Sequence, residues 1–186
     1  MALNSTQIAA LKAAGLADAN VTALISAGSF GAIVAYYNSA ATPDYFVWNP
    51  RTSVQSIYDA MIWGNLTPVD AVPTGDQLSV NIWASRALAC QGKQINIQIM
   101  LQGKDTIDAT KSSTRAGIQD ALTNLPSGAS GALLGGGWAT VKTAMQRLAT
   151  RTEKIFATGS GTSASPSVMV FEGNISDYDV TQAFQQ

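Results

Sequence analysis

The 186-residue sequence contains no histidine, a single cysteine and few charged residues. Without histidine, the chain lacks the side chain that most often serves as a general base and as a metal ligand. The one cysteine, Cys90, excludes an intrachain disulfide, and zinc sites of the usual types are excluded as well. We interpret Cys90 as a small buried apolar residue. We therefore expect a protein that is not an enzyme and that binds no metal and no cofactor.

Charged residues make up 12% of the chain, which is about half the usual share. The formal net charge is −1, so the sequence shows no global attraction for nucleic acid or anionic lipid. Hydrophobic residues reach 46%, enough for a chain of this length to bury a core. A weakly charged surface costs little to desolvate and suits subunit packing. A simple low-charge soluble protein would have the same composition.

Long apolar runs are also missing, since none reaches the roughly 18 residues that a membrane-spanning helix needs. We therefore expect no membrane partner. The first residues lack a basic segment followed by an apolar stretch, and we expect no secretory signal.

Apolar residues recur at helical spacing along most of the chain, between glycines, prolines and polar capping residues. The predicted helices cover residues 5–15, 18–28, 29–38, 53–64, 76–101, 113–125, 138–158 and 177–184. The clearest of these is 138–158, which presents one apolar face over its whole length.

The stretch 94–99 allows two interpretations. It alternates apolar and polar residues, which is typical of a strand, but a helical stripe also runs through Cys90, Ile97 and Leu101. Gly92 weakens a helix by about 1 kcal/mol relative to alanine without breaking it. We favour one long helix.

Extended structure is predicted in two places. Pro43 and Pro50 bracket an apolar segment, and each proline biases its predecessor toward extended geometry. Residues 168–171 have the composition of a short strand. The fold class that we predict is mainly α: a helical bundle with extended loops and a short β segment near the C-terminus. We expect residues 1–186 to form a single helical domain with a C-terminal extended arm at about 159–186.

Candidate catalytic groups are weak. Asp105 and Asp108 stand three positions apart beside Lys104 and Lys111, where we expect both carboxylates to be ionised on a solvated loop rather than to act as an acid–base pair. The glycines at 135–137 precede a predicted helix, but no phosphate-binding loop pattern surrounds them. We assign no catalytic residue.

One charge pattern stands out. Arg147, Arg151 and Lys154 cluster in the C-terminal third, and no lysine or arginine follows them. The acidic residues that follow are Glu172, Asp177 and Asp179. The cluster is either a solvated helix face or an inter-subunit contact in which the basic face of one copy meets the acidic residues of the next. Direct DNA contact is a third interpretation, weakened because three cations release few counterions.

Several segments resemble small virion structural proteins of tailed phages and prophages. The resemblance covers about Ala2 to Val180 and is most specific near the C-terminus. It rests on 89–94 (ACQGKQ), 115–120 (RAGIQD), 149–159 (ATRTEKIFATG), Gly161-Thr162, Ala164-Ser165-Pro166 and Phe171-Glu172-Gly173. It supplies no catalytic residues.

The size and helical content are similar to those of head–tail connector adaptors. That analogy implies a ring of about twelve copies, closed by heterologous contacts, between the portal protein and a tail or nozzle protein. DNA would pass through the lumen without sequence-specific contact. The implied location is the virion, assembled in the host cytoplasm. The alternatives are a capsid decoration or minor head protein, and a tail-associated peptidoglycan hydrolase.

Overall fold

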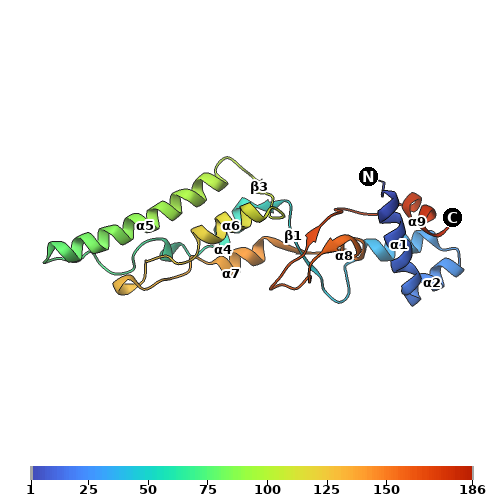
Figure 1. Ribbon diagram of the computed structural model, residues 1–186, viewed down its shortest axis with the longest axis horizontal. Coiled ribbons are helices and arrows are strands. Elements are labelled where there is room, and N and C mark those ends of the chain that lie inside the picture. The colour runs from blue at the N-terminus through green and yellow to red at the C-terminus, as the bar shows by residue number, and fades with distance from the viewer. Residues whose placement is uncertain (1, 186) are drawn as a thin grey trace. The chain divides into compact units, whose positions relative to one another are not determined.

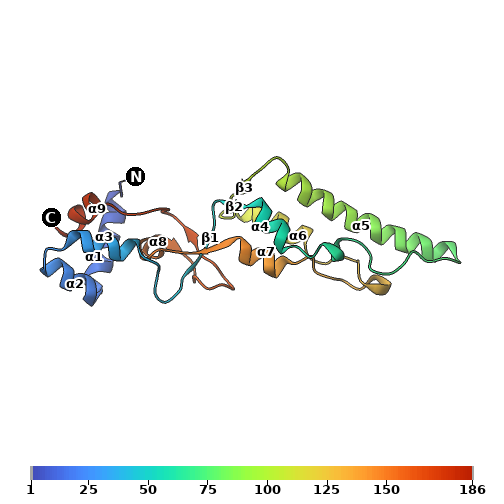
Figure 2. The same ribbon diagram turned by 180° about the vertical axis from the view of Figure 1, so that it is seen from behind.

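The computed structural model describes residues 2–185, and over this range the fold is mainly helical with a few short strands, as the sequence predicted. Figures 1 and 2 show the elements from opposite sides. The helices are α1 (Ser5–Ala17), α2 (Ala19–Ser26), α3 (Phe30–Asn38), α4 (Val54–Ala60), α5 (Gln77–Leu101), α6 (Ser112–Ala121), α7 (Trp138–Ala144), α8 (Arg151–Phe156) and α9 (Asp177–Phe184), with 3-10 turns η1 (Trp63–Leu66) and η2 (Ala129–Gly131).

Within the described residues the strands form three two-stranded sheets, in which β1 pairs with β4, β2 with β3, and β5 with β6. Their bounds are β1 (Phe46–Trp48), β2 (Thr52–Ser53), β3 (Thr106–Ile107), β4 (Gln146–Leu148), β5 (Ala157–Thr158) and β6 (Val168–Met169). The β2–β3 and β5–β6 pairs are antiparallel. The predicted extended segment near Pro43 and the predicted strand near 168 are therefore confirmed.

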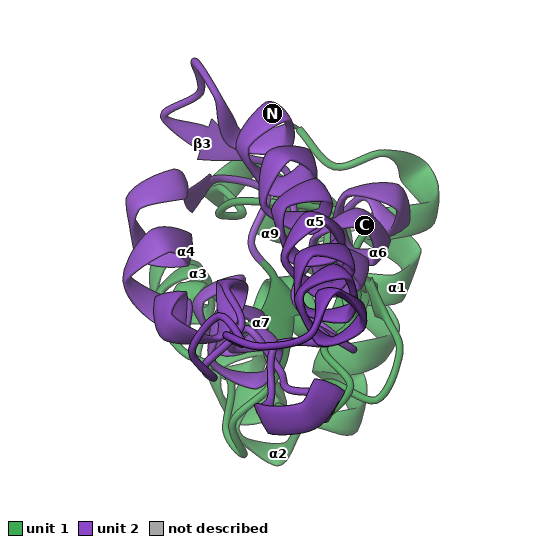
Figure 3. Ribbon diagram, turned by 90° about the vertical axis from the view of Figure 1, so that its left-hand side faces the viewer, with its two compact units in different colours: residues 1–48, 147–186 green, residues 49–146 purple. Residues whose placement is uncertain are grey.

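The chain forms two compact units rather than the single domain expected from the sequence (Figure 3). Unit 1 combines the two ends of the chain, with described residues 2–48 and 147–185, and unit 2 is the continuous segment 49–146. The sequence shows no change of composition at these boundaries, which is why it predicts a single domain.

Unit 1 is a helical cluster in which α1 and α3 pack against α9. Its buried side chains include Leu11, Val21, Ile33, Tyr37, Phe171, Ile175, Val180 and Ala183. A capping box starts α1, because Asn4 accepts from the amide of Gln7 at 2.9 Å and Gln7 accepts from the amide of Asn4 at 3.0 Å. Asp18 caps α2 with a single hydrogen bond, because its side chain accepts from the amide of Asn20 at 2.9 Å.

The expected C-terminal arm is instead part of this cluster. β6 pairs with β5, and α9 lies against α1 and α3. Val180 and Ala183 are fully buried. Small residues fill 159–167, but the apolar side chains that follow give α9 a face to bury.

Unit 2 places α5 against α6 and η1, and α4 against α7. Its fully buried side chains include Ile57, Leu66, Cys90, Ile97, Leu101, Ile118, Leu122, Leu125, Val141 and Met145. The stretch 94–99 lies within α5, so the predicted long helix is confirmed over the strand alternative. The reason is the stripe of Cys90, Ile97 and Leu101, which helical spacing brings to one buried face.

The predicted helix over 138–158 is wrong, because two helices with a strand between them occupy this range. α7 ends at Ala144, β4 follows, and α8 begins after Thr150. Thr150 accepts from the amide of Glu153 at 3.1 Å, while Glu153 accepts from the amide of Thr150 at 2.9 Å. This capping box satisfies the amides of a new helix start, which outweighs the continuous apolar periodicity.

Candidate functional site

Arg147 is held within unit 1 by an ion pair with Glu153. Its Nη1 and Nη2 donate to the two carboxylate oxygens at 2.8 and 2.6 Å, and Glu153 is 2% exposed. Burial acts to raise the pKa of Glu153, but hydrogen bonds from Arg147 and from the Thr150 amide outweigh it, so the pKa lies below its usual value. Of the three residues in the predicted basic cluster, Arg147 is therefore paired with an acidic residue of the same chain.

Arg151 and Lys154 lie on α8 beside two tyrosines. The Arg151 guanidinium sits 4.3 Å from the ring centroid of Tyr36, and its Nη1 donates to Tyr36 Oη at 3.0 Å. Tyr36 in turn donates to Asp18 at 2.6 Å, a hydrogen bond that holds the pKa of Asp18 below its usual value. Lys154 stands 5.5 Å from the ring centroid of Tyr45.

Asp18, Tyr36, Arg151 and Lys154 line a cavity of about 350 Å³. Tyr37 also lines it and is 3% exposed, and Tyr37 Oη has no hydrogen-bond partner among the described residues. Burial raises the pKa of Tyr37 to about 12, so its hydroxyl stays protonated at neutral pH. With Arg151 and Lys154 opposed only by Asp18, the cavity wall carries a small positive excess.

The three acidic residues predicted to meet this cluster differ in their surroundings. Asp179 is 1% exposed and accepts from the Leu3 amide at 2.8 Å and from Ser176 Oγ at 2.7 Å. Burial acts to raise the pKa of Asp179, but these hydrogen bonds hold it below its usual value. Glu172 and Asp177 are exposed. The structure therefore ties Arg147 and Asp179 into unit 1 and leaves the other four predicted residues facing solvent or a cavity.

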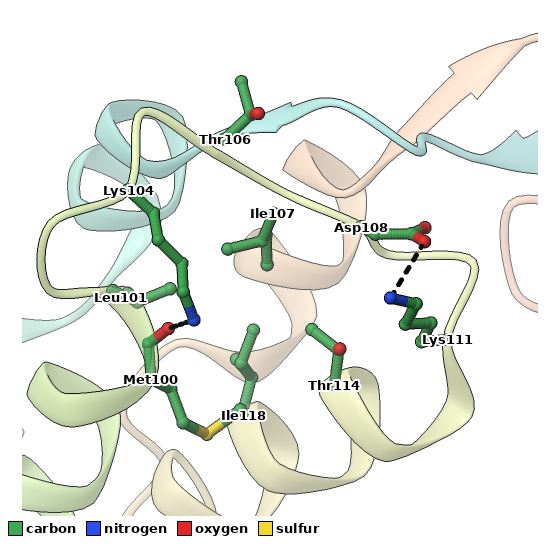
Figure 4. A pocket seen from close by; sticks show the side chains of 9 residues that line it. All are labelled: Met100, Leu101, Lys104, Thr106, Ile107, Asp108, Lys111, Thr114 and Ile118. Atoms are coloured by element: carbon green, nitrogen blue, oxygen red, sulfur yellow. Dashed lines mark hydrogen bonds and ion pairs between the residues drawn. The ribbon is translucent and has the colours of Figure 1, made fainter.

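The acid pair weighed in the sequence is not formed. A cavity of about 250 Å³ lies between α5 and α6, and Figure 4 shows that Asp108 is its one carboxylate. Asp108 accepts from Thr110 Oγ1 at 2.5 Å and pairs with Lys111 Nζ at 3.8 Å. Lys104 Nζ donates to the carbonyl oxygen of Met100 at 2.6 Å. Both lysines and the carboxylate are thus engaged with one another or with the backbone.

The surface that sequence reasoning missed lies on α5. Helix α5 has 25 residues and is about 37 Å long at 1.5 Å per residue. Its large exposed apolar side chains are Leu78, Ile82, Leu88, Ile95 and Ile99, between 44% and 70% exposed. We call Leu78, Ile82, Ser85, Ala89, Gly92, Asn96 and Ile99 the outer stripe, because alternating spacings of four and three residues place them along one exposed line.

Within α5, which is described throughout, both charged residues lie on the side that faces the rest of unit 2. Arg86 pairs with Asp70 through two hydrogen bonds of 3.0 and 2.5 Å. Lys93 Nζ donates to the carbonyl oxygens of Asp120 and Thr123 at 2.6 and 2.9 Å. The outward surface of α5 consequently carries no charged side chain.

A groove of about 610 Å³ runs beside α5, on a different side of the helix from the outer stripe. We call it the α5 groove; its walls are Leu66, Thr67, Pro68, Trp83, Ala84, Ala87, Leu88, Gln91 and Gln94. Trp83 is fixed in this wall, because its indole Nε1 donates to the carbonyl oxygen of Asp70 at 2.9 Å. The groove walls are uncharged and largely apolar.

A signal for this surface was present in the sequence. One helical stripe accounts for the buried residues Cys90, Ile97 and Leu101, yet Leu88 and Ile99 fall outside it. Apolar residues on both sides of a single-layer helix indicate a second partner. The core stripe alone is enough to predict the helix, but it leaves the exposed Leu88 and Ile99 unexplained.

No protein-family model, curated protein or solved structure matches the chain. Across residues 2–185, no single helix is long and apolar enough to span a membrane, although α1 and α2 pass that test as a pair bent by 98°. The same residues contain no group of three or more histidine, cysteine, aspartate or glutamate side chains placed to hold a metal ion.

Proposed function

We propose that the protein is a non-enzymatic structural subunit of a tailed-phage virion, and that it acts as a head–tail connector adaptor. In this role it binds the portal protein on one side and a tail or nozzle protein on the other. Copies form a ring of about twelve, closed by heterologous contacts, and DNA passes through the lumen without sequence-specific contact.

The observation that carries this proposal is the uncharged apolar surface of α5. Several large apolar side chains exposed on one element mark an interaction site or an aggregation hazard. Covering a leucine or isoleucine contributes about 1.5–3 kcal/mol, and five such side chains lie open along one helix. A partner subunit that covers α5 therefore gains a large favourable term without having to desolvate a charge.

The composition supports the same function. Only 12% of residues are charged, and several of them are used inside the units: Arg86, Arg147, Glu153 and Asp179. The remaining surface is rich in small polar side chains, which pack against a neighbour at low cost.

In such a contact, complementary charges on neighbouring copies determine the register between them more than the affinity. Arg151 and Lys154 on one copy, and Glu172 and Asp177 on the next, are the four predicted contact residues that stay available for this purpose. Arg147 and Asp179 are excluded from the proposed contact because each is already paired within unit 1.

Co-expression with the portal protein of the same phage tests the proposal. We expect a complex whose mass, measured by native mass spectrometry, corresponds to a ring of this chain on the portal. A chain that joins neither portal nor tail components would contradict it. Copy number per virion separates the adaptor from a capsid decoration or minor head protein, since a connector ring needs about a dozen copies and a decoration protein needs hundreds.

A tail-associated peptidoglycan hydrolase is the remaining alternative. Such an enzyme needs an acid and a base placed around a scissile bond. A cell-wall degradation assay with the purified chain decides the matter, and we expect no activity.

A further inference from the structure

We propose that a cavity in unit 1 binds a small, singly charged carboxylate with an apolar body. The cavity has a volume of about 350 Å³ and lies where α1, α3 and α8 pack together. Every residue that lines it belongs to unit 1, so the site is complete within one compact unit. Nothing in the connector role requires such a ligand, and the inference therefore goes beyond the proposed function.

The charge of the cavity wall favours a single negative charge on the ligand. Arg151 and Lys154 stand three positions apart on α8, which places both on one face of the helix. Asp18 is the one carboxylate among the lining residues, and its pKa lies below the usual value, so it is ionised at neutral pH. Two cations and one anion leave one positive charge. A monoanion balances that charge, whereas a phosphate dianion would leave an excess negative charge in a partly buried site.

The Arg151 guanidinium is held in place and still has donors to offer. Its Cζ lies 4.3 Å from the ring centroid of Tyr36. Its Nη1 donates to Tyr36 Oη at 3.0 Å and its Nε donates to Ser39 Oγ at 3.3 Å, while its Nη2 has no partner among residues 2–185. A guanidinium fixed in this way binds a carboxylate with little further loss of side-chain freedom.

The hydroxyl of Tyr37 is a second, independent sign of a ligand. Tyr37 lines the cavity and is 3% exposed, and its Oη has no hydrogen-bond partner in the part of the chain that the structure describes. The large majority of buried hydroxyls are hydrogen-bonded, because a buried polar group without a partner is unfavourable. Asp18, Tyr36 and Arg151 all act electrostatically on the pKa of Tyr37, which places its hydroxyl near the charged groups of the cavity.

The groups that await a partner in this cavity are donors. Lysine and arginine side chains donate hydrogen bonds and accept none. Burial raises the pKa of Tyr37 to about 12, so its hydroxyl stays protonated at neutral pH and has a hydrogen to donate. An ionised carboxylate accepts hydrogen bonds and donates none. It therefore matches Tyr37, Arg151 and Lys154 better than a neutral amide, which brings donors of its own.

The rest of the wall suits an apolar body. Ala14 of α1 and Ile155 of α8 line the cavity beside the two tyrosines. Sites for small ligands commonly have this character, with apolar walls and a few placed polar groups. An apolar cavity of about 150 Å³ is enough to hold benzene, so the larger volume here admits a ring with a short chain. A free acid and the C-terminal residue of a peptide both present such a carboxylate, and the test separates these two sources.

The probe is phenylpropionate, and phenylpropionamide is the matched compound without the charge. Isothermal titration calorimetry at neutral pH measures binding to the purified full chain, and thermal unfolding gives a second readout. We expect the acid to bind and to raise the unfolding temperature, and the amide to do neither. Inorganic phosphate should bind roughly 10-fold more weakly than the acid. A dipeptide of alanine and phenylalanine, acetylated at its N-terminus, presents the carboxylate of a chain end: tighter binding than the free acid assigns the site to a peptide, and weaker binding assigns it to a free acid.

Two substitutions with matched controls test the residues. Tyr37→Phe removes a hydroxyl that has no partner among the described residues, so it should keep the stability of the chain yet weaken binding of the acid roughly 10-fold. Tyr178→Phe, at a tyrosine of α9 that is 63% exposed, should bind as the unsubstituted chain does. Arg151→Gln should weaken binding roughly 100-fold, whereas Arg51→Gln, at an exposed arginine of unit 2, should leave it unchanged. Circular dichroism checks that each variant retains its helix content.

Three results would overturn the inference: an amide that binds as tightly as the acid, phosphate that binds more tightly than the acid, or Tyr37→Phe and Arg151→Gln chains that bind the acid like their controls. Arg151 and Lys154 are also proposed to meet acidic residues of a neighbouring copy, so the titration is carried out without the portal protein. A chain that joins the portal but binds no carboxylate would keep the proposed function and lose this site. A chain that binds the acid but joins no portal or tail component would do the reverse.

Discussion

Glu153 and Arg147 form a two-point ion pair that joins a helix start to a strand. The carboxylate lies in the first turn of α8 and the guanidinium lies in β4, with nitrogen–oxygen distances of 2.6 and 2.8 Å. Glu153 also accepts from the amides of Thr150 and Gly173, at 2.9 and 3.2 Å. One buried carboxylate therefore fixes the capping box, the strand and the turn before Ile175.

Glu153→Gln should lower the free energy of unfolding by about 2–3 kcal/mol. Breaking a fully buried ion pair costs about 3–5 kcal/mol, and the effect is smaller here because the Arg147 side chain keeps 29% of its exposure. Urea unfolding measures the change. Glu172→Gln is the matched control, since Glu172 is exposed and its loss should stay within about 0.5 kcal/mol. Equal effects of the two substitutions would show that the ion pair does not stabilise unit 1.

Stability should fall in acid because the pKa values of Glu153 and Asp179 are both lowered in the folded chain. A carboxyl with a lowered folded pKa binds its proton less tightly when folded than when unfolded. Its contribution is fully present above the unfolded value of about 4, and it is lost as the pH falls through the folded pKa. Urea unfolding from pH 7 to pH 3 should show a plateau and then a decline. The double variant E153Q/D179N should start lower and decline less, and an unchanged slope would refute this assignment.

Two adjacent tyrosines, Tyr36 and Tyr37, should differ in how the stability of the chain responds to removal of the hydroxyl. Tyr36→Phe loses the hydrogen bonds to Asp18 and from Arg151 and should destabilise the chain by about 1 kcal/mol, a value limited by the partly open site. Tyr37→Phe removes a buried hydroxyl that has no partner among residues 2–185, so stability should stay the same or rise by up to about 1 kcal/mol. Thermal and urea unfolding of the pair decide it. A destabilised Tyr37→Phe would indicate that the hydroxyl is hydrogen-bonded in solution.

Local signals in the sequence are sufficient to predict where most of the helices begin and end. Gly28 and the Asp18 cap bound α2, and Ser176 starts α9 at the predicted residue because its side chain accepts from the Asp179 amide. The break between α7 and α8 is also encoded locally, in the Thr150 to Glu153 spacing of a capping box, although the apolar periodicity of the segment predicts a continuous helix. The division into two units depends on which helices pack together, and helical periodicity does not encode that choice.

The candidate site was harder to predict than the fold. Charges drew attention to Arg147 and Asp179, yet the structure uses both as internal partners of buried groups. The Asp179 pairing depends on a residue distant in sequence, Leu3, whereas the partner of Arg147 is Glu153, six positions away. The α5 surface carries no charge or motif. It becomes visible only when Ile97 and Leu101 are assigned to the core and Leu88 and Ile99 remain outside.

The close approach of Gly15 to Phe184 gives a test of whether the C-terminal segment is part of the core. Gly15 is buried in α1, and a Cβ at this position would overlap the Phe184 ring of α9. Gly15→Ala should therefore lower the free energy of unfolding by about 1–3 kcal/mol, although alanine favours a helix. Gly31→Ala is the control, because Gly31 is exposed on α3 with open space around it, and it should stabilise the chain by up to about 1 kcal/mol.

A double-mutant cycle separates this clash from a general effect on α1. Phe184→Leu removes the ring that the new methyl group would meet, so Gly15→Ala should cost less in the Phe184→Leu background than alone. Urea unfolding of the four chains gives the interaction free energy. If Gly15→Ala is as stable as the unsubstituted chain, or if the two changes are additive, α9 does not pack on α1 and the segment after residue 159 behaves as an arm after all.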